Sequence, residues 1–383
     1  MVEVLLAMAG AGLAITALAL RRNLGKGRDL LADTESMAKQ LGLSVVTSAN
    51  VEDAIVLTGQ VGDDQVNLAY RAGVTNRQTA VTMEPSRSVP RGLLIRPAAD
   101  ADKLARSLAV RSGDPSLDAD VVIIGEPAEV LALLVADVRT GLANEVPLWK
   151  IHVVDGHLRM TADALLTEPM MMELLLASMK LLARLLTTGE GTTPQRLAKN
   201  ATEDPLPLVR FLNLEALLEH APEAPDIPRT VWAAMEDGHP LPRLAAAVHQ
   251  LRPGDGGTRI PFPPGVAGYR TSPALAVQEV ADRATAELLA ALDETTAGEA
   301  EAAAMVLGAH GDACAEGALL ELLAHHEGPG VRLAAADALG NLGTEQSIQT
   351  LKETADPLRS GHVLKEACKD ALRRVRSRLT RET

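Results

Sequence analysis

The chain has 383 residues, enough for two or three domains, and 47% of them are hydrophobic, which excludes a chain that is disordered as a whole. Only 2% are aromatic, so the cores have to be built from Leu, Ala, Val and Ile, as in closely packed helices. The formal net charge of -13 argues against general nucleic-acid binding. The two cysteines, Cys314 and Cys368, are too few for a disulfide framework, and we interpret them as reduced core residues.

The amino terminus contains an apolar segment that predicts a membrane anchor. Residues 4–20 carry no charge, and a helix of that length spans about 25 Å, near the lower limit for crossing a bilayer. Four basic residues follow at Arg21, Arg22, Lys26 and Arg28, and they favour a cytoplasmic location for the carboxyl side. We therefore expect residues 1–28 to be a single-pass anchor in the cytoplasmic (inner) membrane, with the soluble domains facing the cytoplasm. A cleaved signal peptide and a buried helix are the alternatives.

The next segment, residues 29–190, predicts an α+β domain with mostly antiparallel strands. Polar and apolar residues alternate on both sides of two hairpin turns, at residues 62–64 and at Asp155-Gly156. The strands are expected in hairpins at 53–73 and 148–162 and in segments 78–84, 92–97 and 119–125. Helices are expected at 29–41, 126–143 and 168–186 because their apolar residues recur at helical spacing.

Three aspartates in residues 112–125 raise the question of a cation site. Asp114, Asp118 and Asp120 have carboxylates that could bind a hard metal, but such loops place their ligands at closer, regular spacing. A turn leading into a buried strand explains the same residues, and we prefer that interpretation. The order of this turn, a strand, a helix and a Trp-led hairpin resembles bacterial membrane-anchored domains of unknown function, a resemblance that implies no activity.

The carboxyl-terminal half contains an internal repeat of about 32 residues. "AAAMVLGAHGD" from Ala302 matches "AAADALGNLGT" from Ala334, which aligns Gly308 with Gly340. Arg210 and Arg243 are 33 residues apart in two earlier helical segments. Such a period is the signature of a solenoid, in which each helix pair buries its apolar face only by stacking on its neighbours. We expect the alanine-rich run to form the first helix of each pair.

These segments resemble the HEAT-repeat family of armadillo-like helical solenoids, over about residues 194–380. The resemblance implies that an arginine before each alanine run, at Arg210, Arg243 and Arg332, bonds between repeats with a preceding aspartate, which Gly328 or Gly330 replaces in one unit. We expect all-α repeats at 194–251 and 273–383, separated by a Gly/Pro-rich loop at 252–272 that is either a linker or a functional insertion.

The same resemblance includes some enzymes, so a catalytic role has to be considered. Deoxyhypusine hydroxylase binds two irons through His-Glu pairs at helix starts, but this sequence has Arg332-Leu333, Arg243-Leu244 and Lys365-Glu366 there, and its only His-Glu step is His326-Glu327. Similarity to bilin lyases in the repeats alone does not indicate their chemistry. The densest set of potential metal ligands lies at both ends of one helix and lacks a fourth convergent ligand. It consists of His310, Asp312, Cys314, His325 and His326.

The last segment, residues 365–383, predicts a basic helix, which is either a solvated end or a contact for anionic lipid or an acidic partner. From all these patterns we expect a membrane-anchored scaffold that binds a protein partner through its helical repeats, without catalysis and without a cofactor or metal. The alternative is an enzyme or enzyme subunit, metal-dependent or lyase-like, that uses the α+β domain or a site in the repeats. The candidate structural residues are Arg210, Arg243, Arg332, Gly308 and Gly340.

Overall fold

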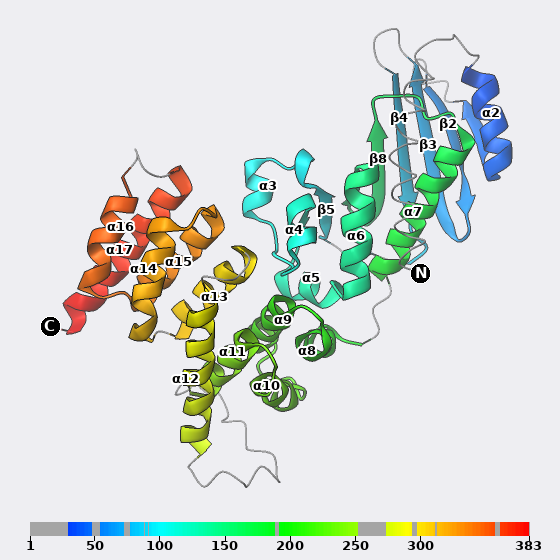
Figure 1. Cartoon of the computed structure of the whole chain (residues 1–383). Helices are drawn as coiled ribbons and strands as arrows, with labels where there is room; N and C mark the ends of the chain where they lie inside the picture. The colour runs from blue at the N-terminus through cyan, green and yellow to red at the C-terminus, as the bar shows by residue number, and fades with distance from the viewer. Residues whose placement is uncertain are drawn as a thin grey trace. The chain divides into compact units, whose positions relative to one another are not determined.

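In the computed structural model the chain divides into two compact units, Met1–Gly191 and Thr192–Thr383 (Figure 1). The structure describes residues 30–47, 54–72, 77–87, 89–90, 92–187, 191–251, 273–292, 297–310, 312–356 and 361–382. The expected membrane anchor and the Gly/Pro-rich loop at 252–272 lie outside the described residues. Among the described helices, none combines the length and the apolar character that crossing a membrane requires.

The amino-terminal unit is built on one eight-stranded sheet in which every neighbouring pair is antiparallel. Its order is β1-β2-β3-β4-β8-β7-β5-β6. The strands are β1 (Ser44–Thr47), β2 (Ala54–Val61), β3 (Asp64–Ala72), β4 (Arg77–Glu84), β5 (Leu94–Pro97), β6 (Val121–Ile124), β7 (Ile151–Val154) and β8 (His157–Ala162). The prediction of a mostly antiparallel sheet is therefore confirmed. The short strand β1 had no sequence signal.

Alternation along the strands gives the sheet one buried and one polar face, as in other antiparallel sheets. The core contains Leu68, Val81 and Met160 from the strands, packed with Leu175 and Met179 of helix α7 (Pro169–Thr187). Helices α2 (Leu30–Leu41) and α6 (Ala136–Trp149) also contact the sheet. On the other face a polar row crosses the sheet. It runs through the paired residues Ser44, Thr58, Asn67, Thr82, Arg159 and His152.

Two elements of this unit differ from the sequence prediction. The single helix expected at 126–143 is two helices, α5 (Pro127–Leu133) and α6, because the chain leaves the helical conformation at Leu134 and Arg139 binds the freed Leu134 carbonyl at 2.7 Å. The turn expected after Asp114 is a short helix, α4 (Pro115–Asp120), since Asp114 caps it and a proline at its first position is already set for a helix. The remaining helical elements are η1 (Ala98–Asp100) and α3 (Lys103–Ser107).

The carboxyl-terminal unit is entirely helical in its described residues. Its helices are α8 (Thr193–Glu203), α9 (Pro207–His220), α10 (Ile227–Met235), α11 (Pro240–Leu251), α12 (Pro273–Ala291), α13 (Ala297–His310), α14 (Glu316–His325), α15 (Pro329–Leu342), α16 (Glu345–Thr354) and α17 (His362–Glu382), with the short η2 (Ala313–Ala315) before α14. Helices α9, α11, α13, α15 and α17 stack in chain order, each against the next. We call these five helices the stacked layer.

The pairing of helices differs in phase from the sequence prediction. The alanine-rich helices were expected to open each repeat, but α15 packs against the preceding α14, and α9, α11 and α17 likewise pack against the helix before them. In these four hairpins the helix of the stacked layer is thus the second member. The small side chains of Ala335, Ala336 and Ala338 in α15 are buried because they face the neighbouring helices of the stacked layer.

Candidate interaction surface

Arg210 joins two repeats of the carboxyl-terminal unit. Its Nε and Nη2 atoms donate to Asp237 Oδ2 and Oδ1 at 2.7 and 2.8 Å, and its Nη1 donates to the Asp204 carbonyl at 2.7 Å. The side chains of Arg210 and Asp237 are only 14% and 9% exposed. A two-pronged, largely buried pair of this kind fixes the orientation of α9 relative to the start of α11.

The two other candidate arginines make different contacts. Arg243 donates to the Asp237 carbonyl at 3.2 Å and pairs with Glu287 of α12. Arg332 donates from Nε to the Leu323 carbonyl at 2.9 Å, which ties α15 to the end of its own partner helix α14. Of these three arginines, Arg210 alone makes, within the described part of the chain, the contact with an aspartate of another repeat that the resemblance implied.

The loops before α9, α11 and α15 share one hydrogen bond. Asp204 and Asp237 accept from the backbone N–H groups of Leu206 and His239, and His326 Nδ1 accepts in the same way from Gly328 at 2.9 Å. Each acceptor lies three residues before the proline that begins the helix. His326 therefore occupies the position of the aspartate, rather than Gly328 or Gly330.

The two candidate glycines permit close contacts between helices. A Cβ atom added to Gly308 would lie 2.5 Å from both Cα and Cβ of Ala338 in α15, and one added to Gly340 would lie 2.6 Å from the Arg374 guanidinium of α17. Both distances are shorter than real contacts, but only at Gly308 is the neighbour backbone, so the packing requires glycine there, whereas the flexible Arg374 side chain can move away from a Cβ at residue 340. The sequence match between Gly308 and Gly340 thus corresponds to equivalent places in successive layers of the stack.

A further link between repeats involves the buried carboxylate of Glu316 at the start of α14. It accepts hydrogen bonds from the backbone N–H and the hydroxyl of Thr344 and from the Ser347 hydroxyl, which belong to the beginning of α16. Glu316 is 6% exposed. The sequence did not reveal this network, because an isolated glutamate at a helix start is expected to be solvated.

The basic helix α17 uses some of its charges for packing. Arg374 donates to Asn341 and Asp337, and Arg378 donates to the carbonyls of Gly340, Asn341 and Gly343 at the end of α15. Lys369, Arg373 and Arg376 are exposed. They align with Ala336 and Gly340 of α15 and with Gly343 just after it, so charged residues stand in α17 where the earlier repeat has small ones. This face of α17 is consistent with the solvated end that the sequence predicted.

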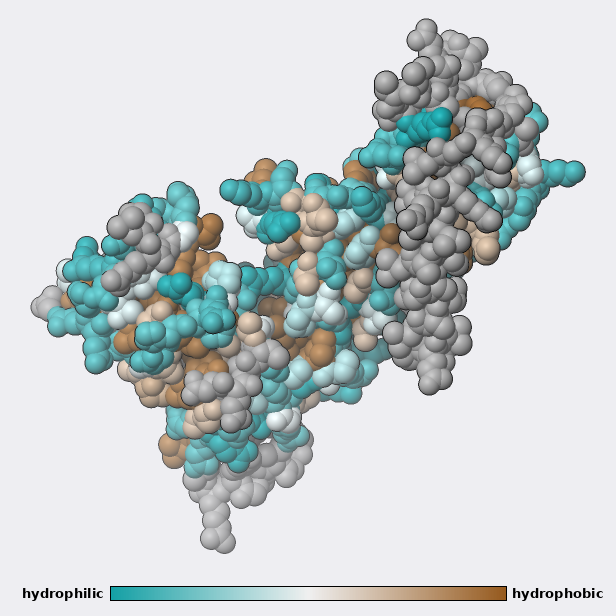
Figure 2. Space-filling model, turned by 45° about the horizontal axis from the view of Figure 1, so that its top comes forward, coloured by the Kyte–Doolittle hydropathy of each residue, from teal (hydrophilic) through white to brown (hydrophobic). Residues whose placement is uncertain are grey.

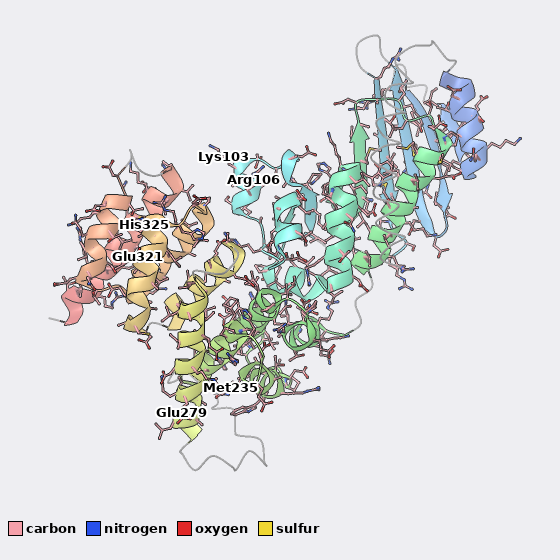
Figure 3. The ribbon with its side chains drawn as sticks, in the orientation of Figure 1. Lys103, Arg106, Met235, Glu279, Glu321 and His325 are labelled. Atoms are coloured by element: carbon pink, nitrogen blue, oxygen red, sulfur yellow. The ribbon has the colours of Figure 1, made fainter. Side chains whose placement is uncertain are left out.

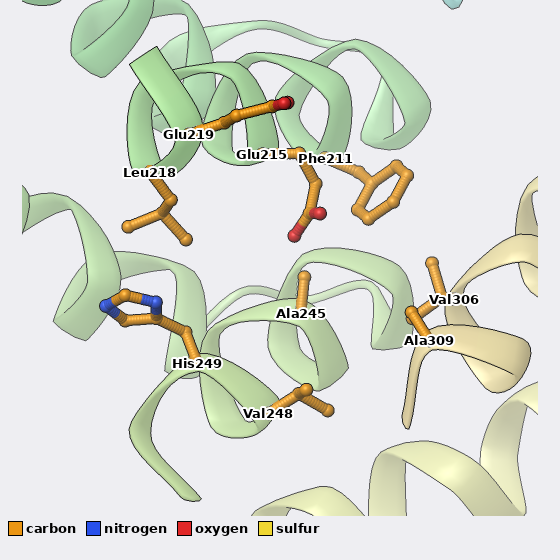
Figure 4. A pocket seen from close by; sticks show the side chains of 9 residues that line it. All are labelled: Phe211, Glu215, Leu218, Glu219, Ala245, Val248, His249, Val306 and Ala309. Carbon is orange, nitrogen blue, oxygen red and sulfur yellow. The ribbon is translucent and has the colours of Figure 1, made fainter. Parts of the chain in front are cut away.

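A groove with a volume of about 330 Å³ opens on the stacked layer (Figure 4). It is lined by Phe211, Glu215, Leu218 and Glu219 of α9, by Ala245, Val248 and His249 of α11, and by Val306 and Ala309 of α13. The base is apolar because Phe211, Ala245, Val248 and Val306 are buried, while the glutamates are exposed at its edge. Figure 2 shows hydrophilic residues over most of the visible surface, with apolar residues in small separate groups. The groove thus combines features of a recognition site, an apolar base and a polar rim.

The aspartates of the amino-terminal unit are engaged in the local structure. Asp114 binds Ser116 and, at 3.1 Å, the buried Arg139. Burial tends to raise the Asp114 pKa, but the hydrogen bonds from Ser116 and Arg139 outweigh it, and the pKa lies below its usual value. Asp118 accepts from the backbone N–H groups of Ser112 and Gly113, and burial raises its pKa. These contacts hold the start of α4 and the residues just before it, and Asp120 is exposed.

The potential metal ligands around α14 are also dispersed. Asp312 accepts from the Cys314 backbone N–H at 2.9 Å and thereby caps η2. His325 lies one turn from Glu321 on α14, 3.6 Å away, and both side chains point to solvent (Figure 3). His326 accepts from the Gly328 N–H in the loop before α15, as described above. Within the described residues no group of three or more His, Cys, Asp or Glu side chains is arranged to hold a metal ion.

The fold of the carboxyl-terminal unit defines a helical-repeat structure. Residues 285–373, from the second half of α12 into α17, match the family model described as HEAT repeats. The prediction of HEAT repeats is thereby confirmed for this segment. No curated protein and no solved structure gave a significant match to the chain.

Sequence reasoning missed the groove. Glu215 and Glu219 are four residues apart, so they lie on one face of α9, and Phe211 precedes Glu215 by the same interval. The sequence therefore did contain a signal, namely an exposed acidic pair on the same helix face as an aromatic residue. The contributions of α11 and α13 could not be assigned without knowing which helix of each repeat belongs to the stacked layer.

Proposed function

We propose that the chain is a membrane-anchored scaffold that binds a partner protein through the stacked layer of its HEAT-like repeats, without catalysing a reaction. The observation that carries the proposal is the groove formed by α9, α11 and α13. Repeats of this kind expose a continuous surface made by equivalent helices, and such surfaces commonly serve as binding sites. The groove adds an apolar base, which a partner side chain can cover.

The contacts between repeats support this role because they hold the surface in one shape. Arg210 and Asp237 fix α9 against α11, and Glu316 with Thr344 and Ser347 fixes α14 against α16. Gly308 lets α13 pack directly on α15. A surface that is already ordered loses less conformational entropy when a partner binds.

Site-specific photocrosslinking in cells tests this proposal. A photoreactive amino acid at Ala309, exposed at the rim of the groove, is expected to give a covalent adduct with a second protein. The same amino acid at Lys352, exposed on α16, is the matched control and is expected to give none. Equal adducts at both positions, or none at Ala309, would contradict a binding site in the groove.

We also propose that residues 1–28 anchor the chain in the cytoplasmic membrane with both units in the cytoplasm. The support is the uncharged segment 4–20 and the basic residues that follow it. Membrane fractionation followed by protease treatment of intact cells tests this topology. A carboxyl-terminal tag is expected in the membrane fraction and resistant to protease until the membrane is opened; digestion in intact cells would refute the orientation.

The competing proposal is an enzyme that uses the amino-terminal unit. It receives little support, since Asp114 and Asp118 are engaged by Arg139, Ser116, Ser112 and Gly113. Metal analysis of the purified full-length chain distinguishes the two proposals. A stoichiometric metal that is lost in Asp118→Asn would favour the enzyme.

A further inference from the structure

We propose that the groove of α9, α11 and α13 binds a basic segment of the partner protein, with the stem of a lysine or arginine on the apolar base and its charge at the acidic rim. This inference rests on the proposed binding function and specifies the chemistry of the partner. Three features of the groove support it: its charged side chains, the carboxyl ends of its three helices and its apolar base.

The side chains that line the groove favour a positive charge. Among the nine lining residues are two glutamates, and none is a lysine or arginine. In Figure 4, Glu215 extends from α9 toward α11, beside the ring of Phe211, and Glu219 lies on the same helix one turn further. Two carboxylates on one wall attract a cationic side chain and repel an acidic one.

The helix ends add to this preference independently of the side chains. Helix α9 ends at His220, α11 at Leu251 and α13 at His310. Glu219, His249 and Ala309, one from each of these helices, belong to the last turns and line the groove. A helix carries roughly half a negative charge at its carboxyl end, so three such ends at one groove favour cations.

The arginines of α9 and α11 are engaged at the opposite ends of their helices. Arg210 and Arg243 belong to the first turns of α9 and α11 and are paired with Asp237 and Glu287. Glu215 is five residues beyond Arg210, which is roughly 8 Å along the helix axis. The positive charges of these helices are therefore used near their amino-terminal ends, away from the groove.

The base of the groove selects a side chain with an apolar stem. Phe211, Val248 and Val306 are buried, with Phe211 only 5% exposed, and they leave an apolar surface under the rim. Lysine and arginine bury their methylene groups on such surfaces while the charged end stays at the water boundary. A cation over the Phe211 ring would gain a further attraction. A phosphate or an acidic peptide would meet only repulsion from the rim.

Binding of synthetic peptides to the purified full-length chain in mild detergent tests the inference. Three fluorescent peptides have leucines at the same positions. At the other positions the basic peptide carries lysine and arginine, the acidic peptide glutamate and the neutral peptide glutamine. Fluorescence anisotropy is expected to show binding of the basic peptide only, and the binding is expected to weaken as salt screens the charges. Binding of the acidic or the neutral peptide with similar affinity would overturn the inference.

Variants connect the binding to the groove. Glu215→Gln with Glu219→Gln is expected to raise the Kd of the basic peptide by about three- to tenfold, as for the loss of two exposed charge pairs. Ala309→Trp is expected to block the groove without changing its charge. The matched control, Glu321→Gln, removes a 78% exposed carboxylate on α14 and is expected to leave the Kd unchanged. All four residues are exposed, so these changes leave the core intact.

The outcomes separate this inference from the proposed function. If no basic peptide binds but the photocrosslinker at Ala309 still captures a protein, the partner chemistry is wrong and the binding function stands. If neither occurs, both fail. If the chain associates with itself and Arg373→Glu in α17 abolishes that association, the basic segment belongs to a second copy, and a separate partner is excluded.

Discussion

The backbone of α13 at Gly308 lies against Ala338 of α15, so closely that a Cβ atom at Gly308 would be 2.5 Å from two carbon atoms of Ala338. Replacement of Gly308 by alanine is therefore expected to push the two helices apart. Overpacking of this kind lowers the free energy of unfolding by about 1–3 kcal/mol. Urea unfolding followed by circular dichroism measures the change.

Gly317→Ala is the matched control for this substitution. Gly317 lies in α14, and no atom is within 4 Å of a Cβ added there. Because alanine favours helix more than glycine does, this change is expected to be neutral or to stabilise the chain by up to about 1 kcal/mol. Equal effects of Gly308→Ala and Gly317→Ala would show that helix propensity, rather than the contact with Ala338, determines the result.

The pair of Arg210 and Asp237 predicts a second stability effect. Asp237→Ala leaves the largely buried Arg210 guanidinium without its two-pronged partner. The expected decrease in the free energy of unfolding is about 2–4 kcal/mol, because an unpaired charge remains between repeats. Hydrogen exchange is expected to rise first in α9 and α11. Lys369→Ala, which removes one partner of the exposed pair with Glu366, is expected to change stability by less than about 0.5 kcal/mol.

Asp114 and Arg139 predict a pH dependence in the amino-terminal unit. The hydrogen bonds that hold the Asp114 pKa below its usual value stabilise the folded chain at neutral pH, and this contribution is lost as the pH falls through the lowered pKa. Asp114→Ala is expected to cost about 1.5–3 kcal/mol at neutral pH, since Arg139, which is 2% exposed, loses the charged hydrogen bond to this carboxylate. Acid unfolding of the variant and the wild type measures both effects. Asp120→Ala, at an exposed aspartate, is the control and is expected to leave the profile unchanged.

The sequence predicted the parts of the fold that repeat or alternate. The two hairpins were visible because polar and apolar residues alternate on either side of Gly62 and of Asp155-Gly156. Gly308 and Gly340 were visible because a close contact recurs at the same place in successive repeats. Arg210 was visible because Arg243 follows it at the repeat distance of 33 residues, whereas its partner Asp237 was not identified from the sequence.

The features that the sequence missed depend on tertiary contacts. The break between α5 and α6 is not marked by proline or glycine at Leu134, and it becomes understandable only when Arg139 is seen on the Leu134 carbonyl. Glu316 belongs to a network whose other members, Thr344 and Ser347, have no sequence pattern that connects them to it. The groove required the ends of three helices to be placed side by side.

Cys368 in α17 predicts a loss of stability at high pH. Its thiol is fully buried, and burial raises its pKa from 9.0 to about 11, although the nearby Arg332 acts in the opposite direction. The unfolded chain therefore releases this proton at lower pH than the folded chain. The free energy of unfolding is therefore unaffected by this thiol below about pH 9. It decreases by roughly 2–3 kcal/mol in total as the pH rises through about 11.

Unfolding in urea at a series of pH values tests the Cys368 prediction. Cys368→Ala is expected to remove this part of the alkaline slope, at the cost of a pH-independent loss for the small cavity. Cys314 is exposed, so the prediction that it is a core residue is wrong. Cys314→Ala is expected to keep most of the slope, because desolvation raises the pKa of this thiol as well but solvent screens its contribution. Alkylation of the folded chain is expected to modify Cys314 and to spare Cys368 until α17 separates from α15, because a buried protonated thiol is a poor nucleophile. Rapid modification of Cys368 under native conditions, or an unchanged slope in Cys368→Ala, would contradict the burial of this thiol in the stack.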